Sequence, residues 1–458
     1  MRTFDVFTPF KSRPSVNSRG CCQDCDEPFP WIFQMETLVA RLRSRVASRC
    51  PHWHSTLETL VANNSWTFNR DGVLREAALT IPHFLDSSLN FDNSEQVAPV
   101  GRDSELRGNH VILRRAARIR NRDGSSPQRM FLLSHLDTVY PPATATPEFS
   151  SLVPVCSKMS IYKGPGSMDI KGGTCMMMAV LDTLSAVSPS TYDAIDWTVM
   201  LNASEEILAP DFAELAKREV LSSASPPVAC LVFEAGPCTE LPGHARSWGL
   251  VADRKGRATW DVEAMGIEAH AGNNHQQGQN AIVALSKAVV DIAALTDYTA
   301  DLTFNVGRVH GGTTANTVPG HASCELEMRA RDLTVFESAI EAFKRMLANR
   351  HPTVDARLIS SELPWAPNPE TDQLIATWAR AATIVGEHER VVPESRGGLS
   401  DGNFLWQLCP TLDGSSACLR LCGACAFAWS MPYSICSKRN SFCIWFYTYR
   451  VRTQVWEW

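Results

Sequence analysis

Residues 129–138 read RMFLLSHLDT, and this stretch decides the fold that the sequence predicts. It begins as a short apolar run, which is typical of a buried β-strand. His135 and Asp137 follow at once, two residues apart, so both side chains point to one face where the strand ends. Similar runs at 110–113, 197–202 and 228–233 alternate with helical patterns such as 174–186. The sequence therefore predicts an α/β domain with a mostly parallel sheet.

A different order of elements begins near residue 250. The patterns predict strand, helix, strand, strand, helix and strand over 257–264, 278–294, 301–309, 322–329, 334–349 and 353–359. This βαββαβ order is the ferredoxin-like unit, here inserted into the larger domain. The predicted organisation is a disordered leader (1–30), a catalytic domain in two parts (31–249 and 361–414), the inserted domain (250–360) and a Cys- and Trp-rich tail (415–458).

Before the first strand, the apolar residues of 36–49 recur at helical spacing, and the sequence predicts that Pro51 ends this helix. A second helical pattern lies near 56–63 and a third near 71–85.

Composition excludes several classes of protein. A net charge of −6 over 458 residues offers no basic surface for nucleic acid, and no apolar run approaches 18 residues, so we expect no membrane span. Fifteen cysteines in a chain of this length do not indicate a small disulfide-rich domain. With no apolar run of signal-peptide length in the first 30 residues, the sequence predicts a cytoplasmic protein with reduced cysteines.

Acidic or histidine residues follow three predicted strands and open one predicted helix. They are His135, Glu205 with Glu206, Glu234, and Asp169 in the glycine-rich turn GPGSMDIKGG. Each signal alone is weak, because His-x-Asp pairs, Glu-Glu pairs and helix N-caps are common on ordinary surfaces. In open α/β sheets, however, sites form at the carboxyl ends of the strands. Together the residues predict a two-metal hydrolytic centre whose mixed ligands best suit zinc.

Several motifs now carry a resemblance to a known family. The segments are SHLDTVYP, GPGSMDIKGG, NASEE, FEAGP, AHAG with GQNAI, GGTTANTVPG and RGGLSDGNF, in this order within residues 57–414. The chain resembles the co-catalytic zinc metallopeptidases that include glutamate carboxypeptidase, aminoacylase, acetylornithine deacetylase and succinyl-diaminopimelate desuccinylase. Among these enzymes, its motifs most resemble those of glutamate carboxypeptidase. The resemblance implies a zinc-dependent hydrolase that cleaves an amide bond of a small peptide or N-acyl amino acid. The alternative within the family is an aminoacylase or deacetylase.

The resemblance also implies a role for each residue of the centre. His135 and Glu234 would bind one zinc ion, Glu206 would bind the second, and Asp169 would bridge both, with a cis peptide bond to the next residue. Asp137 would accept the other ring N–H of His135 and fix its orientation.

The remaining implied roles concern the reaction and the substrate. Glu205 would be the general base that takes a proton from the metal-activated water. His270 would reach from the inserted lid and dimerisation domain into the partner's site and stabilise the oxyanion, which implies a homodimer and a closing lid. Asn316 would help to hold the substrate. Arg329 or Arg331 would clamp a substrate carboxylate, although a plain surface charge is the alternative interpretation of either arginine.

The resemblance stops after PTLDG at 410–414. The family places its last metal-binding histidine in the segment that follows, but no histidine occurs here after His388. The tail instead carries Cys418, Cys422 and Cys425 at a spacing known from radical iron–sulfur enzymes, or usable by a structural zinc knot. The other interpretation is that residues 415–458 come from a retained intron or a shifted reading frame and are not family sequence. The second zinc site is then incomplete, and the alternative function is that of a catalytically impaired metal-binding relative.

Overall fold

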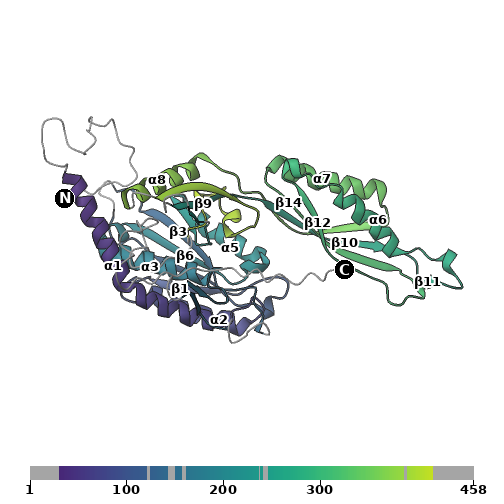
Figure 1. Ribbon diagram of the computed structural model, residues 1–458, viewed down its shortest axis with the longest axis horizontal. Helices are drawn as coiled ribbons and strands as arrows, with labels where there is room; N and C mark the ends of the chain where they lie inside the picture. Colours follow the sequence, from purple (N-terminus) through teal and green to yellow (C-terminus); the bar gives the residue numbers. More distant parts are fainter. Residues whose placement is uncertain are drawn as a thin grey trace.

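The computed structural model describes residues 30–415 except 121–123, 143–149, 157–160, 237, 241–245 and 386–388. The predicted leader, apart from Pro30, and the tail after Ser415 lie outside the described residues. Figure 1 shows a sheet flanked by helices and, at one end of it, an elongated arm built by the inserted segment. We call this arm the lid.

The central sheet has six strands in the order β1–β2–β6–β3–β7–β17. The strands are β1 (Asn93–Val97), β2 (His110–Arg115), β3 (Gln128–His135), β6 (Ile195–Asn202), β7 (Ala229–Val232) and β17 (Thr411–Leu412). Strand β3 pairs in parallel with β6 and β7, and β7 with β17, whereas β2 is antiparallel to β1 and β6. The prediction of a mostly parallel sheet is confirmed, so the carboxyl ends of β3, β6 and β7 share one edge.

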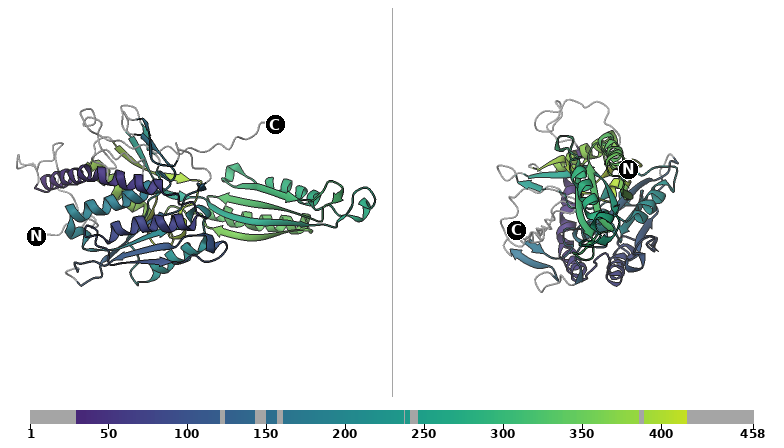
Figure 2. Two further views of the ribbon diagram at one scale, coloured as in Figure 1. Left: turned by 90° about the horizontal axis from the view of Figure 1, so that it is seen from below. Right: turned by 90° about the vertical axis from the view of Figure 1, so that its right-hand side faces the viewer.

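Both faces of the central sheet are buried, which explains its uninterrupted apolar strands. On β3, Leu132 packs with one hydrophobic cluster, while Phe131 and Leu133 pack with another. The first cluster includes α1 (Pro30–Ala62), α2 (Arg70–Leu85) and α3 (Lys171–Val187), and the second includes α5 (Pro210–Leu221). The sheet is thus a middle layer between helices (Figure 2).

The prediction that Pro51 ends the first helix is wrong, because α1 continues through this proline to Ala62. A proline inside a helix costs about 3 kcal/mol. Val46 and Cys50 before it and Trp53 and Leu57 after it are all buried in the same cluster. Burying large apolar side chains contributes about 1.5–3 kcal/mol each, so this continuous stripe outweighs the lost hydrogen bond.

The lid has the predicted βαββαβ order. Its elements are β10 (Gly256–Met265), α6 (Ala281–Ala293), β12 (Thr303–Gly311), β14 (His321–Ala330), α7 (Leu333–Arg350) and β15 (Val354–Glu362). The four strands are antiparallel in the order β12–β14–β10–β15. Alternate residues of β10, including Trp260, pack with Phe343 of α7 and Leu285 of α6. Two short strands, β11 (Ala269–His270) and β13 (Thr317–Val318), pair at the far end of the lid (Figure 1).

A second, three-stranded sheet was not predicted. It contains β8 (Cys238–Glu240), β9 (Arg246–Arg254) and β16 (Glu389–Arg396), with α8 (Pro369–Val385) in contact. Strand β9 leads directly into the lid, and the chain returns past Trp365, whose backbone pairs with that of Arg254. This pairing forms the hinge between lid and catalytic domain.

The remaining strands and α-helix of the described residues are β4 (Val153–Cys156), β5 (Ile161–Lys163) and α4 (Pro189–Tyr192). Within the described part of the chain, no helix combines the length and the apolar character that crossing a membrane requires.

Candidate metal centre

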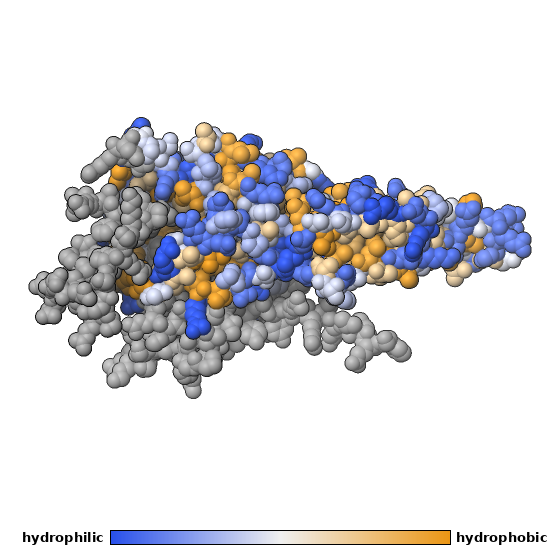
Figure 3. All heavy atoms as spheres, turned by 90° about the horizontal axis from the view of Figure 1, so that it is seen from above, coloured by the Kyte–Doolittle hydropathy of each residue, from blue (hydrophilic) through white to orange (hydrophobic). Residues whose placement is uncertain are grey.

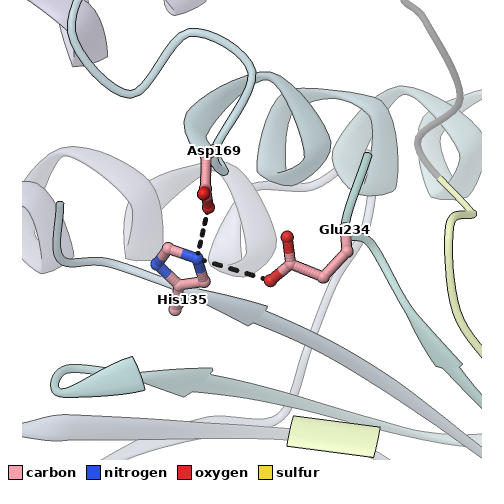
Figure 4. A group of neighbouring side chains, drawn as sticks. All are labelled: His135, Asp169 and Glu234. Atoms are coloured by element: carbon pink, nitrogen blue, oxygen red, sulfur yellow. Dashed lines mark hydrogen bonds and ion pairs between the residues drawn. The ribbon is translucent and has the colours of Figure 1, made fainter. Parts of the chain in front are cut away.

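Three side chains converge where the strands of the central sheet end. His135 is the last residue of β3, Asp169 lies in the turn before α3, and Glu234 follows β7 (Figure 4). The His135 Nε2 atom is 3.0 Å from Asp169 Oδ1 and 3.4 Å from Glu234 Oε1. One ligand atom from each residue lies within 4.8 Å of the other two. The structure therefore brings together the three residues predicted to hold one metal ion.

The orientation of the His135 ring favours a cation at this place. Its Nδ1 lies 3.0 Å from the backbone oxygen of Asp137, so Nδ1 carries the proton and donates. Nε2 then faces two carboxylates, which requires either a second proton or a cation between them. Burial would lower the pKa of His135, but Asp137, Asp169 and Glu234 outweigh it and raise this pKa well above its ordinary value. One imidazole and two carboxylates form a donor set that zinc accepts, so the residues present fit the metal.

Asp137 links the histidine to the Glu205–Glu206 pair. Its carboxylate accepts hydrogen bonds from the Thr67 hydroxyl at 2.7 Å and from the backbone N–H groups of Glu205 at 3.1 Å and Glu206 at 3.3 Å. One of its oxygens also lies 3.4 Å from His135 Nδ1. The sequence predicts Asp137 only as the partner of the histidine. The structure adds that it anchors the short helix η3 (Glu205–Ile207).

Glu205 lies against the three converging side chains. Its Oε2 is 4.0 Å from His135 Nε2, and the residue is 8% exposed. Burial, together with the negative charges of Glu234 and Asp401, raises the pKa of Glu205 well above its ordinary value. A carboxylate that takes up a proton readily beside the metal ligands has the property that a general base needs.

Glu206 lies near the other acidic groups of the centre. Burial and the charge of Asp169 raise the pKa of Glu206 to about 9. Its Oε1 atom is buried and has no hydrogen-bond partner within the described ranges. Burying a carboxylate oxygen without a hydrogen-bond partner costs folding free energy unless a proton or a cation binds to it. Glu206 could therefore hold a second ion, as the resemblance implies, but the sequence has no histidine after His388 to share it.

The backbone at Gly414 reaches the same centre. Gly414 packs so closely against Gly236 that a side-chain carbon on Gly236 would lie 2.5 Å from the Gly414 oxygen. Gly236 is two residues beyond the candidate ligand Glu234. The segment in which the family histidine is expected thus begins beside the metal ligands.

Two charged residues of the centre were not singled out from the sequence. Asp401, in η7 (Asp401–Phe404), is buried, and its Oδ1 accepts a hydrogen bond from Asn202 Nδ2 at 2.8 Å. Burial, followed by the charges of Glu234 and Asp137, raises the pKa of Asp401 to about 8. Its segment was noticed as a motif, but no predicted strand leads to it.

Arg254 is the second unpredicted residue. Its Nε donates to Asp413 Oδ2 at 2.9 Å, and both side chains are buried. Its positive charge helps to lower the pKa of Asp169, after the hydrogen bond and charge of His135. No local pattern marks Arg254, because it reaches the centre only through the pairing of β9.

The other predicted site residues do not join these ligands within one chain. His270 and Asn316 lie together at the far end of the lid, where the Ala271 N–H donates to the Asn316 oxygen at 2.8 Å. Arg329 lies at the base of the lid, where its Nε and Nη2 donate to Glu327 at 2.7 and 3.0 Å. Binding of a substrate carboxylate by Arg329 would require it to release Glu327, and its role stays a prediction.

Comparisons with known proteins agree with this arrangement. Residues 253–355 match the M20 peptidase dimerisation domain. The chain is 24% identical over 373 residues to carboxypeptidase G2 of Pseudomonas sp. (strain RS-16), covering 75% of this chain and 84% of that protein. It is also 24% identical over 334 residues to succinyl-diaminopimelate desuccinylase of Burkholderia ambifaria, covering 69% and 82%. The chain is thus similar to M20 metallopeptidases both in its inserted domain and over about two thirds of its length or more.

Solved structures show the same fold as this chain. A tripeptidase of Staphylococcus aureus superposes with a TM-score of 0.59 at 17% identity, covering 80% of this chain and 90% of that one. The M20 family metallo-carboxypeptidase Sso-CP2 of Sulfolobus solfataricus gives a TM-score of 0.59 at 13% identity, covering 79% and 90%. The peptide bond between Asp169 and Ile170 is cis, as the resemblance predicts. The predicted class of metallopeptidase or amidohydrolase is thereby confirmed.

Proposed function

We propose that this protein is a zinc-dependent hydrolase that cleaves an amide bond of a small peptide or an N-acyl amino acid in the manner of a carboxypeptidase. The observation that carries the proposal is the convergence of His135, Asp169 and Glu234 within 4.8 Å, with Glu205 buried against them. The names of two relatives, a carboxypeptidase and a desuccinylase, support both versions of the substrate. Cys175, Cys230, Cys324 and Cys409 are buried and form no disulfide bond, which fits the predicted cytoplasmic location.

His135, Asp169 and Glu234 would hold the first zinc ion, and Asp169 with Glu206 would hold the second less completely. When bound, zinc supplies Lewis-acid polarisation of the scissile carbonyl and makes a water molecule more acidic. Glu205 accepts the proton of the attacking water and then delivers it to the nitrogen of the leaving amine. Asp137 keeps the general base in place through the backbone N–H of Glu205.

His270 is prepared to donate a hydrogen bond to the developing oxyanion. The backbone N–H groups of Gly272 and Asn273 donate to its Nδ1 at 3.1 and 3.2 Å. The neutral ring therefore carries its proton on Nε2, which is left to face a substrate. Because His270 lies at the far end of the lid, we place it in the site of a second copy of the chain (Figure 1).

The surface of the lid supports such a homodimer. Strand β12 is an edge of the lid sheet, and its Val309 is 58% exposed. Val283 and Val290 of α6 are 49% and 68% exposed. Figure 3 shows apolar residues gathered along the lid between its polar groups. An apolar helix face beside an open strand edge is a self-complementary surface that a two-fold axis can pair.

The test of the proposed chemistry distinguishes the role of a general base from that of a metal ligand. Glu205→Gln should abolish hydrolysis of dipeptides and of N-acetyl and N-succinyl amino acids while leaving the zinc content nearly unchanged. Glu214→Gln, which makes the same change on an exposed residue of α5, is the control and should keep full activity. Turnover by the Glu205→Gln protein would refute the assignment of the base.

The dimer is tested by mixing two inactive variants. His270→Ala and Glu205→Gln subunits, unfolded and refolded together, form mixed dimers in which one site has both groups. With random pairing, roughly a quarter of the wild-type activity should return, because half of the dimers are mixed and each has one complete site of two. No recovery in dimers shown by mass to be mixed would refute the shared site.

The missing histidine favours a second candidate, a catalytically impaired relative that binds one zinc ion. No histidine follows His388, so the second site keeps only two of its implied protein ligands. Zinc titration followed by dialysis separates the candidates. One retained ion with no turnover on the substrate panel would support the impaired relative, whereas two ions with turnover would support the hydrolase.

A further inference from the structure

The short helix η7 lies between the hinge of the lid and the strand end that carries Glu205. Four residues, Asp401–Phe404, form it, and a capping box at its start fixes its geometry. In this box the Ser400 hydroxyl accepts from the Gly402 N–H at 3.3 Å, and the Ser400 N–H donates to Asn403 Oδ1 at 3.1 Å. Asp401, the first residue of η7, and Asn403, the third, form hydrogen bonds to different parts of the molecule.

On the hinge side, Asn403 binds both segments of the chain that connect the lid to the catalytic domain. Its Nδ2 donates to the backbone oxygen of Lys255 at 3.4 Å, where the chain enters the lid, and to that of Leu363 at 3.2 Å, where it returns. Gly402 adds a packing contact, since a side-chain carbon there would lie 2.4 Å from the Trp365 ring. The turn therefore cannot keep all its contacts if these two strands move apart.

On the side of the metal centre, Asp401 binds the end of β6. Asn202 Nδ2 donates to Asp401 Oδ1 at 2.8 Å, while Asn202 Oδ1 accepts from the Ser204 N–H at 2.9 Å. Glu205 is the next residue. Asp401, Asn202, Ser204 and Glu205 are all buried, so breaking this chain of hydrogen bonds leaves polar atoms with neither a protein partner nor water.

We propose that η7 couples the position of the lid to the placement of Glu205, with Asn403 and Asp401 as positioning residues. Movement of the hinge strands shifts Asn403, the rigid turn carries the shift to Asp401, and Asn202 passes it to the backbone before the general base. The catalytic side of this proposal rests on the proposed function, because it takes Glu205 as the base. The mechanical side concerns hydrogen bonds alone and does not depend on turnover.

A second contact ties the same turn to the hinge. The Ser400 hydroxyl donates to Asp413 Oδ2 at 2.6 Å, and the same oxygen accepts from Arg254 Nε of the hinge at 2.9 Å. Arg254 in turn donates to the backbone oxygens of Gly398 and Leu399 at 2.9 and 3.2 Å. The hinge therefore holds η7 at two points, the capping residue Ser400 and Asn403.

Hydrogen exchange of the full chain tests the coupling. Asn403→Asp keeps the acceptor for the Ser400 N–H but removes both donors to the hinge. We expect about tenfold faster exchange at the Arg254 and Trp365 amides, which pair across the hinge, and also at the Ser204 amide. The control is Asn305→Asp, which makes the same change on an exposed residue of β12 and should alter none of these amides.

Faster exchange at the hinge with an unchanged Ser204 amide would overturn the proposal. If Asn403→Asp does not fold, Asn403→Ala removes the same donors without adding a buried charge and is judged by the same amides. In a chain that hydrolyses its substrates, Asn403→Asp should also lower kcat with little change in KM. A chain without turnover would refute the proposed function, while the exchange result would still decide the coupling.

Discussion

Asp137→Asn is the perturbation that tests the centre most directly. Asp137 Oδ1 accepts a hydrogen bond from the backbone N–H of Glu205. Its Oδ2 accepts hydrogen bonds from the Thr67 hydroxyl and from the backbone N–H of Glu206. An asparagine keeps one oxygen and replaces the other by an NH₂ group. The Thr67 hydroxyl can rotate and accept from this group, but a backbone N–H cannot. The side chain should therefore turn its NH₂ toward Thr67, and the Glu206 N–H should lose its acceptor.

The size of the effect follows from these contacts. One buried backbone donor left without an acceptor costs about 1–3 kcal/mol of the free energy of unfolding. The negative charge beside His135 Nδ1 is also lost, and changes of such partners typically weaken metal binding by about 10–100-fold. We expect both losses in Asp137→Asn. Thr67→Val removes a single hydroxyl bond and should cost about 1 kcal/mol with little change in zinc affinity.

The assays are urea denaturation of the metal-free protein and zinc competition against a chromophoric chelator. The first assay measures the loss of folding stability, and the second measures the loss of zinc affinity. If Asp137→Asn bound zinc as tightly as the wild type, the carboxylate would have no part in orienting His135. If Thr67→Val weakened zinc binding as much as Asp137→Asn, the effect would come from packing around Thr67 and not from the charge.

Two further predictions concern pH and packing. The pKa of Glu206 is raised to about 9 from 4.5 and that of Asp401 to about 8 from 3.8, so the folded metal-free protein holds protons that the unfolded chain releases, and its stability falls as the pH rises through this window. Zinc favours the ionised carboxylates, so the gain in Tm on adding zinc should be larger near pH 8 than near pH 6, and an equal gain would contradict these shifts. Gly236→Ala should cost about 1–3 kcal/mol and weaken zinc binding because its new carbon meets the backbone of Gly414, whereas Gly397→Ala, in open space, should change neither quantity in denaturation and zinc-binding assays.

Much of the fold could be predicted because its signals are local. The apolar runs of β3, β6 and β7 are buried on both faces, and the six elements of the lid follow in the predicted order. Strand β16 could not be predicted in this way. Its sequence ERVVPESR alternates poorly and contains a proline, and it becomes a strand through parallel pairing with β9. The continuation of α1 through Pro51 could not be predicted either, because it depends on residues on both sides of the proline packing into one core.

The candidate site divides in a similar way. His135, Asp169, Glu205, Glu206 and Glu234 each follow a strand or open a helix, and parallel strands end at one edge, so their sequence positions already imply that they meet. The absence of a histidine after His388 is likewise a fact of the sequence.

Only the tertiary structure decided how polar and charged groups distant along the chain are paired. Arg254 meets Asp413, and Asn202 meets Asp401, across separations of 159 and 199 residues. Such pairs leave no periodic signal, because a buried charge needs one partner at hydrogen-bond distance and not a partner at any fixed spacing. The sequence by itself thus determined the layers and which residues are candidate ligands, while folding decided which polar groups surround these candidates and connect them to the lid.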